Sequence, residues 1–339
     1  MGSGTFWANR RVLVTGGAGF IGSNLVERLV QLGASVRVAD NLSRGSLDNL
    51  EGCLEKIQFL QLDLTRRDDC VKACCDMEVA LHLASRVGGI SYYLQRPYEV
   101  MADNVLMDTL LLQAALECGV RRCLYVSSAH VYPEELQQRP DSAPLREEDA
   151  LPANPGLSYG WAKLLGEKQV EYAVQQEGRI RAAIVRLIGV YGKNQDTDLA
   201  TASAIPAFIR RAIEYPRRKP FVILGSGEET RSYCYVSDVV EAMLLAVGRL
   251  ESEPLVGPVN VGSEERIRIR DLVQEVIAIS SKDIEVEPDL SHETTIWGQA
   301  LDCSRAHHLL NGWRPRVPLL EGLRATYTHI EGHLNGGTR

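Results

Sequence analysis

The sequence contains no apolar run long enough to cross a bilayer, and its first residues hold no hydrophobic stretch of the kind that directs secretion. Positive charge is not in excess, because 37 Lys and Arg stand against 44 Asp and Glu for a net charge of −7. That balance argues against a nucleic-acid surface. The eight cysteines follow neither metal-ligand nor disulfide spacing. We therefore expect a cytoplasmic protein with reduced thiols, no metal, and neither membrane nor nucleic acid as partner.

Short apolar runs alternate with helical patterns through the first half of the chain, which predicts an α/β fold with a doubly wound parallel sheet. The length of 339 residues suffices for one large α/β unit and a smaller lobe. The expected strands are residues 12–14, 35–39, 57–62, 79–83, 123–126 and 181–186. The long helices expected between them are 104–118 and 158–177. The proline-rich segment 134–157 is expected to lack regular structure and to cover the site.

From about residue 193 the pattern differs and indicates a small C-terminal lobe. The elements expected there are a helix at 204–214, a strand at 221–224, a helix at 236–250, a short strand at 259–262, a helix at 269–279, a strand near 284–286 and a final helix after Pro318. Ser237 and Asp238 stand where the N-cap of the 236–250 helix is expected.

Glycines follow the first expected strand at the spacing G-x-x-G-x-x-G, as Gly16, Gly19 and Gly22. Glycines at these places allow a tight turn and a close approach to a pyrophosphate, which the free N–H groups of the following helix can bind. Asp40 ends the second expected strand, where a carboxylate accepts ribose hydroxyls and repels a 2′-phosphate. The motif therefore predicts NAD rather than NADP, although Arg44 lies nearby; the alternative is an ordinary strand–turn–helix with a solvated Asp40.

Two further places lie where strands of such a sheet end, at the edge that binds ligands. Asp63 follows the third expected strand, where it can meet the adenine or cap a helix from Thr65 onward. Gly88 and Gly89 come soon after the fourth, which suggests either close approach of another molecule or a plain turn.

Tyr159 and Lys163 are four residues apart on an expected helix and therefore share one face. A tyrosine can act as a base near neutral pH only beside a cation, which Lys163 and a bound nicotinamide would supply. Tyr159 could then remove the proton of a sugar hydroxyl, with Ser127 or Ser128 hydrogen-bonded to the same oxygen. The alternative is a solvated Tyr/Lys pair beside a serine turn.

Together these motifs resemble those of the extended short-chain dehydrogenase/reductases that act on nucleotide sugars, from Val12 to about Tyr327. The resemblance implies a Rossmann domain, retained NAD, oxidation of the hexose at C4, and a homodimer built on helices 104–118 and 158–177. It places these residues at the cofactor: Gly16, Gly19, Phe20, Ile21, Gly22, Asp40, Asn41, Asp63, Leu64, Leu83, Ala84, Tyr159 and Lys163. It places these at the nucleotide-diphosphate sugar: Gly88, Gly89, Ser127 and Arg231.

The fold class expected from the resemblance is a Rossmann-type doubly wound parallel sheet with a smaller C-terminal α/β lobe that binds substrate. The NAD-binding domain is expected over residues 1–188, with a returning segment at about 236–262. The nucleotide-sugar lobe is expected over 189–235 and 263–339.

Within this family the chain looks most like GDP-mannose 3,5-epimerase and GDP-fucose synthase, which favours a GDP-sugar. The segments that carry this likeness are Val87–Ile90, Ser127–Pro133 and Ile205–Phe208. Both relatives have an acid/base cysteine where this chain has His130, and histidine titrates near neutrality. Dehydratases have an Asp-Glu pair there, so Ala129-His130 argues against dehydration. The alternative is a structural His130.

Three positions depart from these two relatives. Lys193 is the nearest match to their second acid/base but stands where they have proline, and Gly189 replaces their phosphate-binding asparagine. The arginine that they carry near Trp297–Gln299 is missing.

The sequence thus leads to three hypotheses. The first is an NAD-dependent nucleotide-sugar epimerase with catalytic Ser128, Tyr159, Lys163 and His130, which acts through a C4 ketone. The second is a C4-epimerase, or a C4-dehydrogenase or reductase, without chemistry at C3 or C5. The third is a non-enzymatic, NAD-sensing scaffold.

Overall fold

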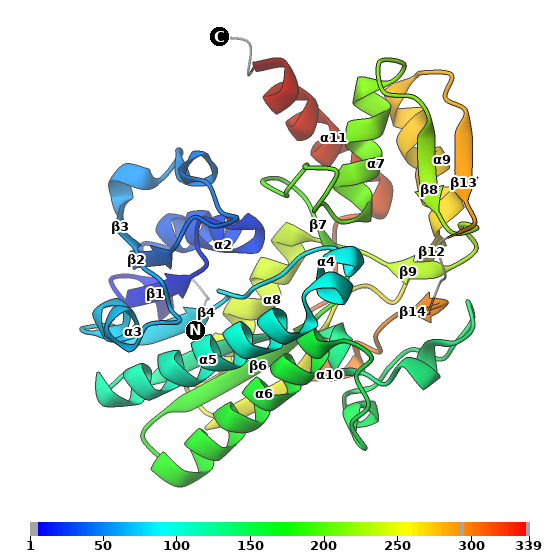
Figure 1. Cartoon of the computed structure of the whole chain (residues 1–339). Coiled ribbons are helices and arrows are strands. Elements are labelled where there is room, and N and C mark those ends of the chain that lie inside the picture. The colour runs from blue at the N-terminus through cyan, green and yellow to red at the C-terminus, as the bar shows by residue number, and fades with distance from the viewer. Residues whose placement is uncertain (1–5, 292–294, 337–339) are drawn as a thin grey trace.

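The computed structural model describes residues 6–291 and 295–336, and a seven-stranded parallel sheet forms its centre (Figure 1). The strands lie in the order β11-β6-β5-β4-β1-β2-β3. Their bounds are β1 Arg11–Thr15, β2 Ser35–Asp40, β3 Ile57–Gln61, β4 Val79–His82, β5 Arg122–Ser128, β6 Arg181–Leu187 and β11 Leu255–Val261. This order reverses direction between β1 and β4, which defines a doubly wound sheet. The predicted fold class is confirmed.

Helices cover both faces of the sheet, so its central strands are apolar on both sides. On one face α2 (Phe20–Gln31) packs against α8 (Val236–Arg249), with Val12 and Val14 of β1 beneath them. The other face carries α3 (Arg67–Cys74), α5 (Pro97–Glu117) and α6 (Ser158–Glu177), and Leu13 points into the core on that side. Figure 1 shows α5 and α6 side by side.

A second hydrophobic core lies where α7 (Ala204–Glu214), α9 (Ile269–Ser280) and α11 (Leu319–Gly336) meet. The remaining elements are short: α4 Ile90–Gln95, α10 Ser304–Leu309, and the strand groups β8 Phe221–Leu224 with β13 Val286–Asp289, β7 Val190–Tyr191 with β10 Cys234–Tyr235, and β9 Thr230–Ser232 with β12 Arg266–Arg268 and β14 Gly298–Gln299. The predicted domain boundaries stay a prediction. Among the described residues, no helix has the length and apolarity needed to cross a membrane.

Several element boundaries differ from those expected. Helix α5 begins at Pro97 rather than at 104. The leucine-rich pattern begins only near 104, but proline is well accommodated at the first helical position, so the helix begins earlier than that pattern. Asp238 does not cap α8: Tyr235 is the N-cap, and the Asp238 carboxylate accepts hydrogen bonds from the backbone N–H groups of Arg316 and Val317. Strand β11 begins four residues earlier than expected, at Leu255, and β13 begins two residues later, at Val286.

The proline-rich segment 134–157 contains two short 3₁₀ turns, Glu134–Gln137 and Glu147–Ala150, where no regular structure was expected. It packs against the C-terminal part of the chain. The N–H of Trp297 donates to the Gln137 carbonyl, and the Thr230 hydroxyl donates to the Pro140 carbonyl. The segment therefore rests on β9 and β14, and its cover over the site stays a prediction.

A buried ion pair joins α6 to the sheet. The Arg186 guanidinium donates to both carboxylate oxygens of Glu167, at 2.8 and 2.7 Å, and both side chains are at most 3% exposed. Arg186 also donates to the Tyr132 hydroxyl and the Glu147 carbonyl. The pair therefore connects β6, α6 and the 134–157 segment.

We predict that Glu167→Gln lowers the free energy of unfolding by about 3–5 kcal/mol, because it leaves the buried Arg186 without a carboxylate. Glu171→Gln on the same helix is the matched control, since its partner Lys168 is 37% exposed and such pairs contribute about 0–1 kcal/mol. Urea denaturation of both variants measures the difference, and equal losses would contradict it.

Candidate active site

The loop after β1 forms a cradle without side chains. A Cβ on Gly22 would lie 2.1 Å from the Gly16 carbonyl oxygen, and one on Gly16, whose φ is +67°, would lie 2.8 Å from the Ala84 nitrogen. Gly19 caps α2 without a side chain, and the first turn contains no acidic residue. The N–H groups of that turn are therefore available to a pyrophosphate, and the predicted cradle fits a dinucleotide.

Asp40 lies at the end of β2, next to this cradle. Its carboxylate accepts hydrogen bonds from the N–H groups of Ala18 at 3.0 Å and Leu42 at 2.9 Å, and the residue is 8% exposed. A carboxylate has about four acceptor positions, so it can still accept from ribose hydroxyls. Arg44 is occupied elsewhere, in an ion pair with Asp196 at 2.6 Å. This arrangement favours NAD over NADP.

The other residues expected at the cofactor are distributed around the same edge of the sheet. The backbone N–H groups of Leu83 and Ala84 donate to the Thr15 hydroxyl, which ties β1 to the loop after β4. Phe20 and Ile21 begin α2. Asn41 accepts from the Ser43 N–H and so closes a turn in the loop after β2. Their contacts to the cofactor stay a prediction.

At the end of β3, Asp63 forms hydrogen bonds with residues that follow it in the chain. One carboxylate oxygen of Asp63 accepts from the N–H and the hydroxyl of Thr65, and the Asp63 N–H donates to the Asp69 carboxylate. Asp63 therefore stabilises the turn before α3, which begins at Arg67 and not at Thr65. The Leu64 side chain is buried beneath that helix, so only its backbone can serve a ligand.

Tyr159 and Lys163 lie on one face of α6, as expected, and both are buried, at 7% and 1% exposure. The Lys163 ammonium is 5.9 Å from the centre of the Tyr159 ring. Burial raises the pKa of Tyr159 above its ordinary value, although hydrogen bonds with Ser85 and Ser128 act in the opposite direction. The pKa of Tyr159 is therefore raised, and not lowered by Lys163 as expected, so Tyr159 needs a further positive charge to ionise.

His130 lies beside Tyr159 in a cluster of three rings. Its ring centre is 5.7 Å from that of Tyr159 and 5.8 Å from that of Tyr93, both edge to face. Tyr93 in turn stacks on Tyr159 at 4.9 Å with an interplanar angle of 13°. Burial lowers the pKa of His130 to about 4, and the positive charge of Arg231 acts in the same direction. The imidazole is therefore neutral at pH 7 and can accept a proton.

Arg231 lies on β9, and its guanidinium donates to the carbonyls of Thr230 and Ile296, at 2.8 and 2.9 Å. No carboxylate of the described residues forms an ion pair with it by the usual distance criterion. A partly exposed guanidinium near His130 is thus suited to an anionic ligand.

Of the residues expected to bind the substrate, Ser127 needs correction, whereas Gly88 and Gly89 stay predictions. The Ser127 hydroxyl donates to Glu167 at 2.5 Å and is 2% exposed, so it belongs to the buried Arg186 pair and does not face the site, contrary to expectation. Gly88 and Gly89 precede α4, and a Cβ on Gly88 would collide with the Tyr92 ring. That collision explains, without a ligand, why a glycine is needed at position 88. Contact between a ligand and Gly88 or Gly89 stays a prediction.

Sequence reasoning missed three residues of this site: Tyr93, Ser85 and Asp108. No spacing rule brings Tyr93 or Ser85 to Tyr159, because the contacts join segments that are distant in the sequence. Asp108 did carry a signal, since it interrupts a leucine-rich helix and is 3% exposed.

A glycine cradle at the switch point of a doubly wound sheet, with a buried Tyr/Ser/Lys group beside it, defines a Rossmann-type dinucleotide enzyme. The pattern of the NAD dependent epimerase/dehydratase family matches residues 12–262. The chain belongs to this family, and its cofactor is NAD.

Relatives within the family have different named activities. A GDP-mannose 3,5-epimerase from Arabidopsis thaliana is 29% identical over 323 residues, which cover 95% of this chain and 82% of that protein. UDP-glucuronic acid decarboxylase 6 from the same plant is 31% identical over 322 residues, 94% of this chain and 88% of that protein. The UDP-glucose 4-epimerase of Thermus thermophilus in complex with NAD has a TM-score of 0.81 at 27% identity, with 95% of this chain and 99% of that chain covered.

We predict that Gly22→Ala weakens NAD binding on the order of tenfold or more, because its Cβ must displace the Gly16 carbonyl and deform the cradle. Gly52→Ala is the matched control, since no atom lies within 4 Å of a Cβ placed there. Cofactor retained after purification, together with titration of added NAD, measures the effect. Unchanged binding in Gly22→Ala would contradict the assignment of the cradle.

Proposed function

We propose that this protein is an NAD-dependent nucleotide-sugar epimerase that acts through a transient C4 ketone, as GDP-mannose 3,5-epimerases do. The observation that carries the proposal is the buried group in which Ser128 and His130 both contact Tyr159, with Arg231 close by. Tyr159, which can remove a hydroxyl proton, and His130, which can remove a carbon-bound proton, thus lie side by side.

Bound NAD supplies the hydride acceptor and donor at C4, together with a positively charged ring. In the proposed mechanism Ser128 orients the C4 hydroxyl of the sugar, and Tyr159 removes its proton. Because a hydrogen-bonded serine and a nearby cation both favour the charged form of a tyrosine, Tyr159 can ionise only when the site is fully assembled.

Once C4 is a ketone, the hydrogens on C3 and C5 are acidic, and His130 takes one of them as a base. The low pKa of His130 makes it a weak base while Arg231 is unneutralised. A diphosphate that binds Arg231 would remove part of that positive field and raise the pKa of His130 toward neutrality. Substrate binding and base strength are thereby linked.

A GDP-sugar is the favoured substrate because the segments Val87–Ile90, Ser127–Pro133 and Ile205–Phe208 resemble those of GDP-mannose 3,5-epimerase and GDP-fucose synthase. The second acid/base of a 3,5-epimerase is not supplied by Lys193, whose ammonium pairs with Glu27 on α2. A C4-epimerase, or a C4-dehydrogenase or reductase, needs only Ser128, Tyr159 and Lys163 and is the competing function.

The deciding experiment incubates the enzyme with GDP-, UDP- and dTDP-sugars in D₂O and locates deuterium on sugar carbons by mass spectrometry and NMR. Deuterium at C3 or C5 supports the proposal. A sugar inverted at C4 without deuterium, or NADH that accumulates, supports the competing function. Release of CO₂ from UDP-glucuronate would instead indicate a decarboxylase, and NAD binding without any turnover would indicate a scaffold.

We predict that His130→Ala abolishes deuterium exchange at C3 or C5 while C4 oxidation persists, seen as transient NADH absorbance. Tyr159→Phe is the companion variant: it should abolish both processes, with a loss of roughly 10²–10⁴-fold, and retain NAD. Exchange that survives in His130→Ala would show that this histidine is structural.

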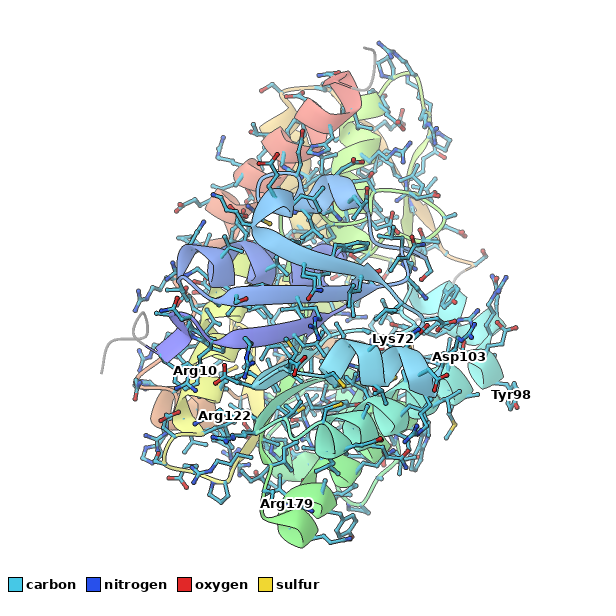
Figure 2. The ribbon with its side chains drawn as sticks, turned by 90° about the vertical axis from the view of Figure 1, so that its left-hand side faces the viewer. Arg10, Lys72, Tyr98, Asp103, Arg122 and Arg179 are labelled. Carbon is cyan, nitrogen blue, oxygen red and sulfur yellow. The ribbon has the colours of Figure 1, made fainter. Side chains whose placement is uncertain are left out.

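The exposed faces of α5 and α6 suggest a partner surface, for which we propose a second copy of this chain. The apolar side chains on these helices that are at least 40% exposed are Tyr98, Met101, Leu106, Trp161, Leu165 and Tyr172. Tyr98, at 82% exposure, projects away from the chain in Figure 2. Two adjacent helices with such faces can form a four-helix contact across a two-fold axis.

We predict that Leu165→Glu converts the dimer to a monomer, because a charge would be buried at the centre of the contact. Leu290→Glu is the control, since Leu290 is 73% exposed and lies after β13, away from these helices. Sedimentation or light scattering measures the mass. A wild-type chain that is already monomeric at micromolar concentration would contradict the homodimer.

A further inference from the structure

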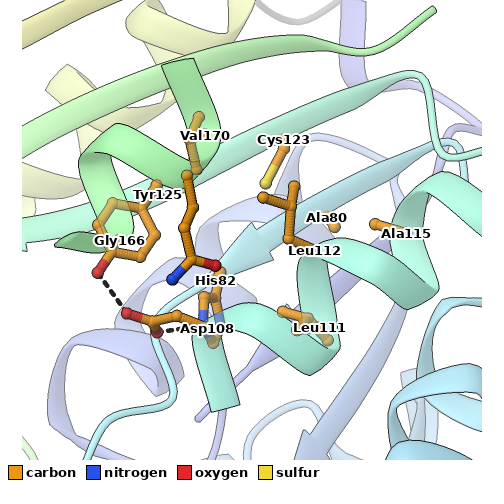
Figure 3. Close-up of a pocket in the computed structure, with 11 residues that line it drawn as sticks. Ala80, His82, Asp108, Leu111, Leu112, Ala115, Cys123, Tyr125, Gly166 and Val170 are labelled. Atoms are coloured by element: carbon orange, nitrogen blue, oxygen red, sulfur yellow. Dashed lines mark hydrogen bonds and ion pairs between the residues drawn. The ribbon is translucent and has the colours of Figure 1, made fainter. Parts of the chain in front are cut away.

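A chain of buried polar groups runs from the end of β1 to the face of α6 that carries Lys163. The Thr15 side chain bonds to His82 Nδ1 at 2.8 Å, and His82 Nε2 bonds to Asp108 Oδ1 at 2.9 Å. The Tyr125 hydroxyl donates to Asp108 Oδ2 at 2.5 Å. Figure 3 shows the last two contacts beside a small cavity between the sheet and helices α5 and α6.

The hydrogen bonds at Thr15 determine where the protons lie. A hydroxyl has one hydrogen to donate and two lone pairs to accept with. The N–H groups of Leu83 and Ala84 both donate to the Thr15 hydroxyl, which favours the arrangement in which its own hydrogen points to His82 Nδ1. In that arrangement His82 carries a hydrogen on Nε2 and donates it to Asp108.

Asp108 accordingly receives two donated hydrogens, one from His82 and one from Tyr125, which is the environment of an ionised carboxylate. A carboxylate that is 3% exposed needs a cation nearby. Of the two buried cations around α6, Arg186 is held by both oxygens of Glu167. Lys163 is the buried cation that remains: it forms no direct ion pair with Asp108, but its ammonium lies 4.8 Å from the centre of the Tyr125 ring, and the charges of Asp108 and Lys163 interact at longer range.

We propose that Asp108 is a positioning residue: its carboxylate, fixed in the charged form by His82 and Tyr125, keeps Lys163 as an ammonium beneath Tyr159. The inference rests on the proposed function, because it takes Tyr159 and Lys163 as the catalytic pair. Asp108 acts through the charges of Lys163 and Tyr159 and is not proposed to contact substrate or cofactor.

The titratable groups around the pair come from every element packed against it. They are His82 on β4, Cys123 and Tyr125 on β5, and Tyr159 and Glu167 on α6. Burial lowers the pKa of Lys163, and the negative charges of Asp108 and then Glu167 raise it again. Asp108 also raises the pKa of Tyr159. Removal of this one charge should therefore lower both pKa values.

The test is Asp108→Asn, which keeps the size and planarity of the side chain and removes its charge. The probe is the ¹³Cε resonance of Lys163 in lysine-labelled NAD-loaded protein, assigned by its disappearance in Lys163→Met. We expect the pKa of Lys163 to fall by about one unit or more in Asp108→Asn. Glu117→Gln on the same helix is the control, because Glu117 is 52% exposed and pairs with Arg67. An unchanged pKa of Lys163 in Asp108→Asn would overturn the proposal.

The pH dependence of turnover gives a second readout, which a purely structural role would not move. Tyr159 must be deprotonated and Lys163 protonated, so both limbs of the profile should shift to lower pH in Asp108→Asn and stay in place in Glu117→Gln. Limbs that stay in place in both variants would count against the proposal. The titration of Lys163 needs no substrate. It therefore tests the proposal even if no turnover is found with any nucleotide sugar.

If Asp108→Asn does not fold, thermal unfolding of two other variants decides. Lys163→Met alone leaves the Asp108 charge buried without its cation, whereas Asp108→Asn combined with Lys163→Met removes both charges. If the charges of Asp108 and Lys163 stabilise each other, the double variant should have a higher thermal-unfolding midpoint than Lys163→Met. A lower midpoint for the double variant would overturn the pairing.

Discussion

The central sheet is covered on both faces, so each charge buried between it and the helices needs a partner inside the protein. The structure meets this requirement twice on α6. Glu167 holds Arg186 with two hydrogen bonds, and the negative charge of Asp108, which His82 and Tyr125 hold in place, acts on the ammonium of Lys163. Helix α6 is thereby fixed to strands β4, β5 and β6, and the orientation of Tyr159 depends on that attachment.

The parts that could be predicted from the sequence are those determined locally. Buried strands are short apolar runs, and the glycine spacing and the Tyr159–Lys163 spacing each lie within one turn or helix. The sequence could not decide between Ser127 and Ser128, because successive strand residues point to opposite faces and both faces of β5 are buried. It also could not find Tyr93, because stacking on Tyr159 depends on how α4 packs against α6.

Capping and hydrogen-bonding groups were the least predictable. Asp238 and Asp63 both have the residue type and position of a helix cap. The structure uses the first to bind the backbone before α11 and the second to close a turn. An aspartate near a helix start offers several acceptor positions, and which N–H reaches them is decided by chain segments that the local sequence does not contain.

The named relatives have different activities although they match this chain over nearly its whole length. Proteins named as a 3,5-epimerase, a decarboxylase and a 4-epimerase match this chain at 29%, 31% and 27% identity, so overall similarity does not distinguish their reactions. Ser128, Tyr159 and Lys163 supply only chemistry at a hydroxyl. The outcome must then depend on the groups that face the rest of the sugar, and in this chain those nearest Tyr159 are two rings, a neutral His130 and Tyr93. A neutral imidazole beside aromatic rings would suit the proposed removal of a carbon-bound proton better than the donation of one, and its strength as a base would increase if an anion neutralised Arg231. In the proposed mechanism the reaction at C3 or C5 would thereby be coupled to correct placement of the diphosphate, which a reaction confined to C4 would not require.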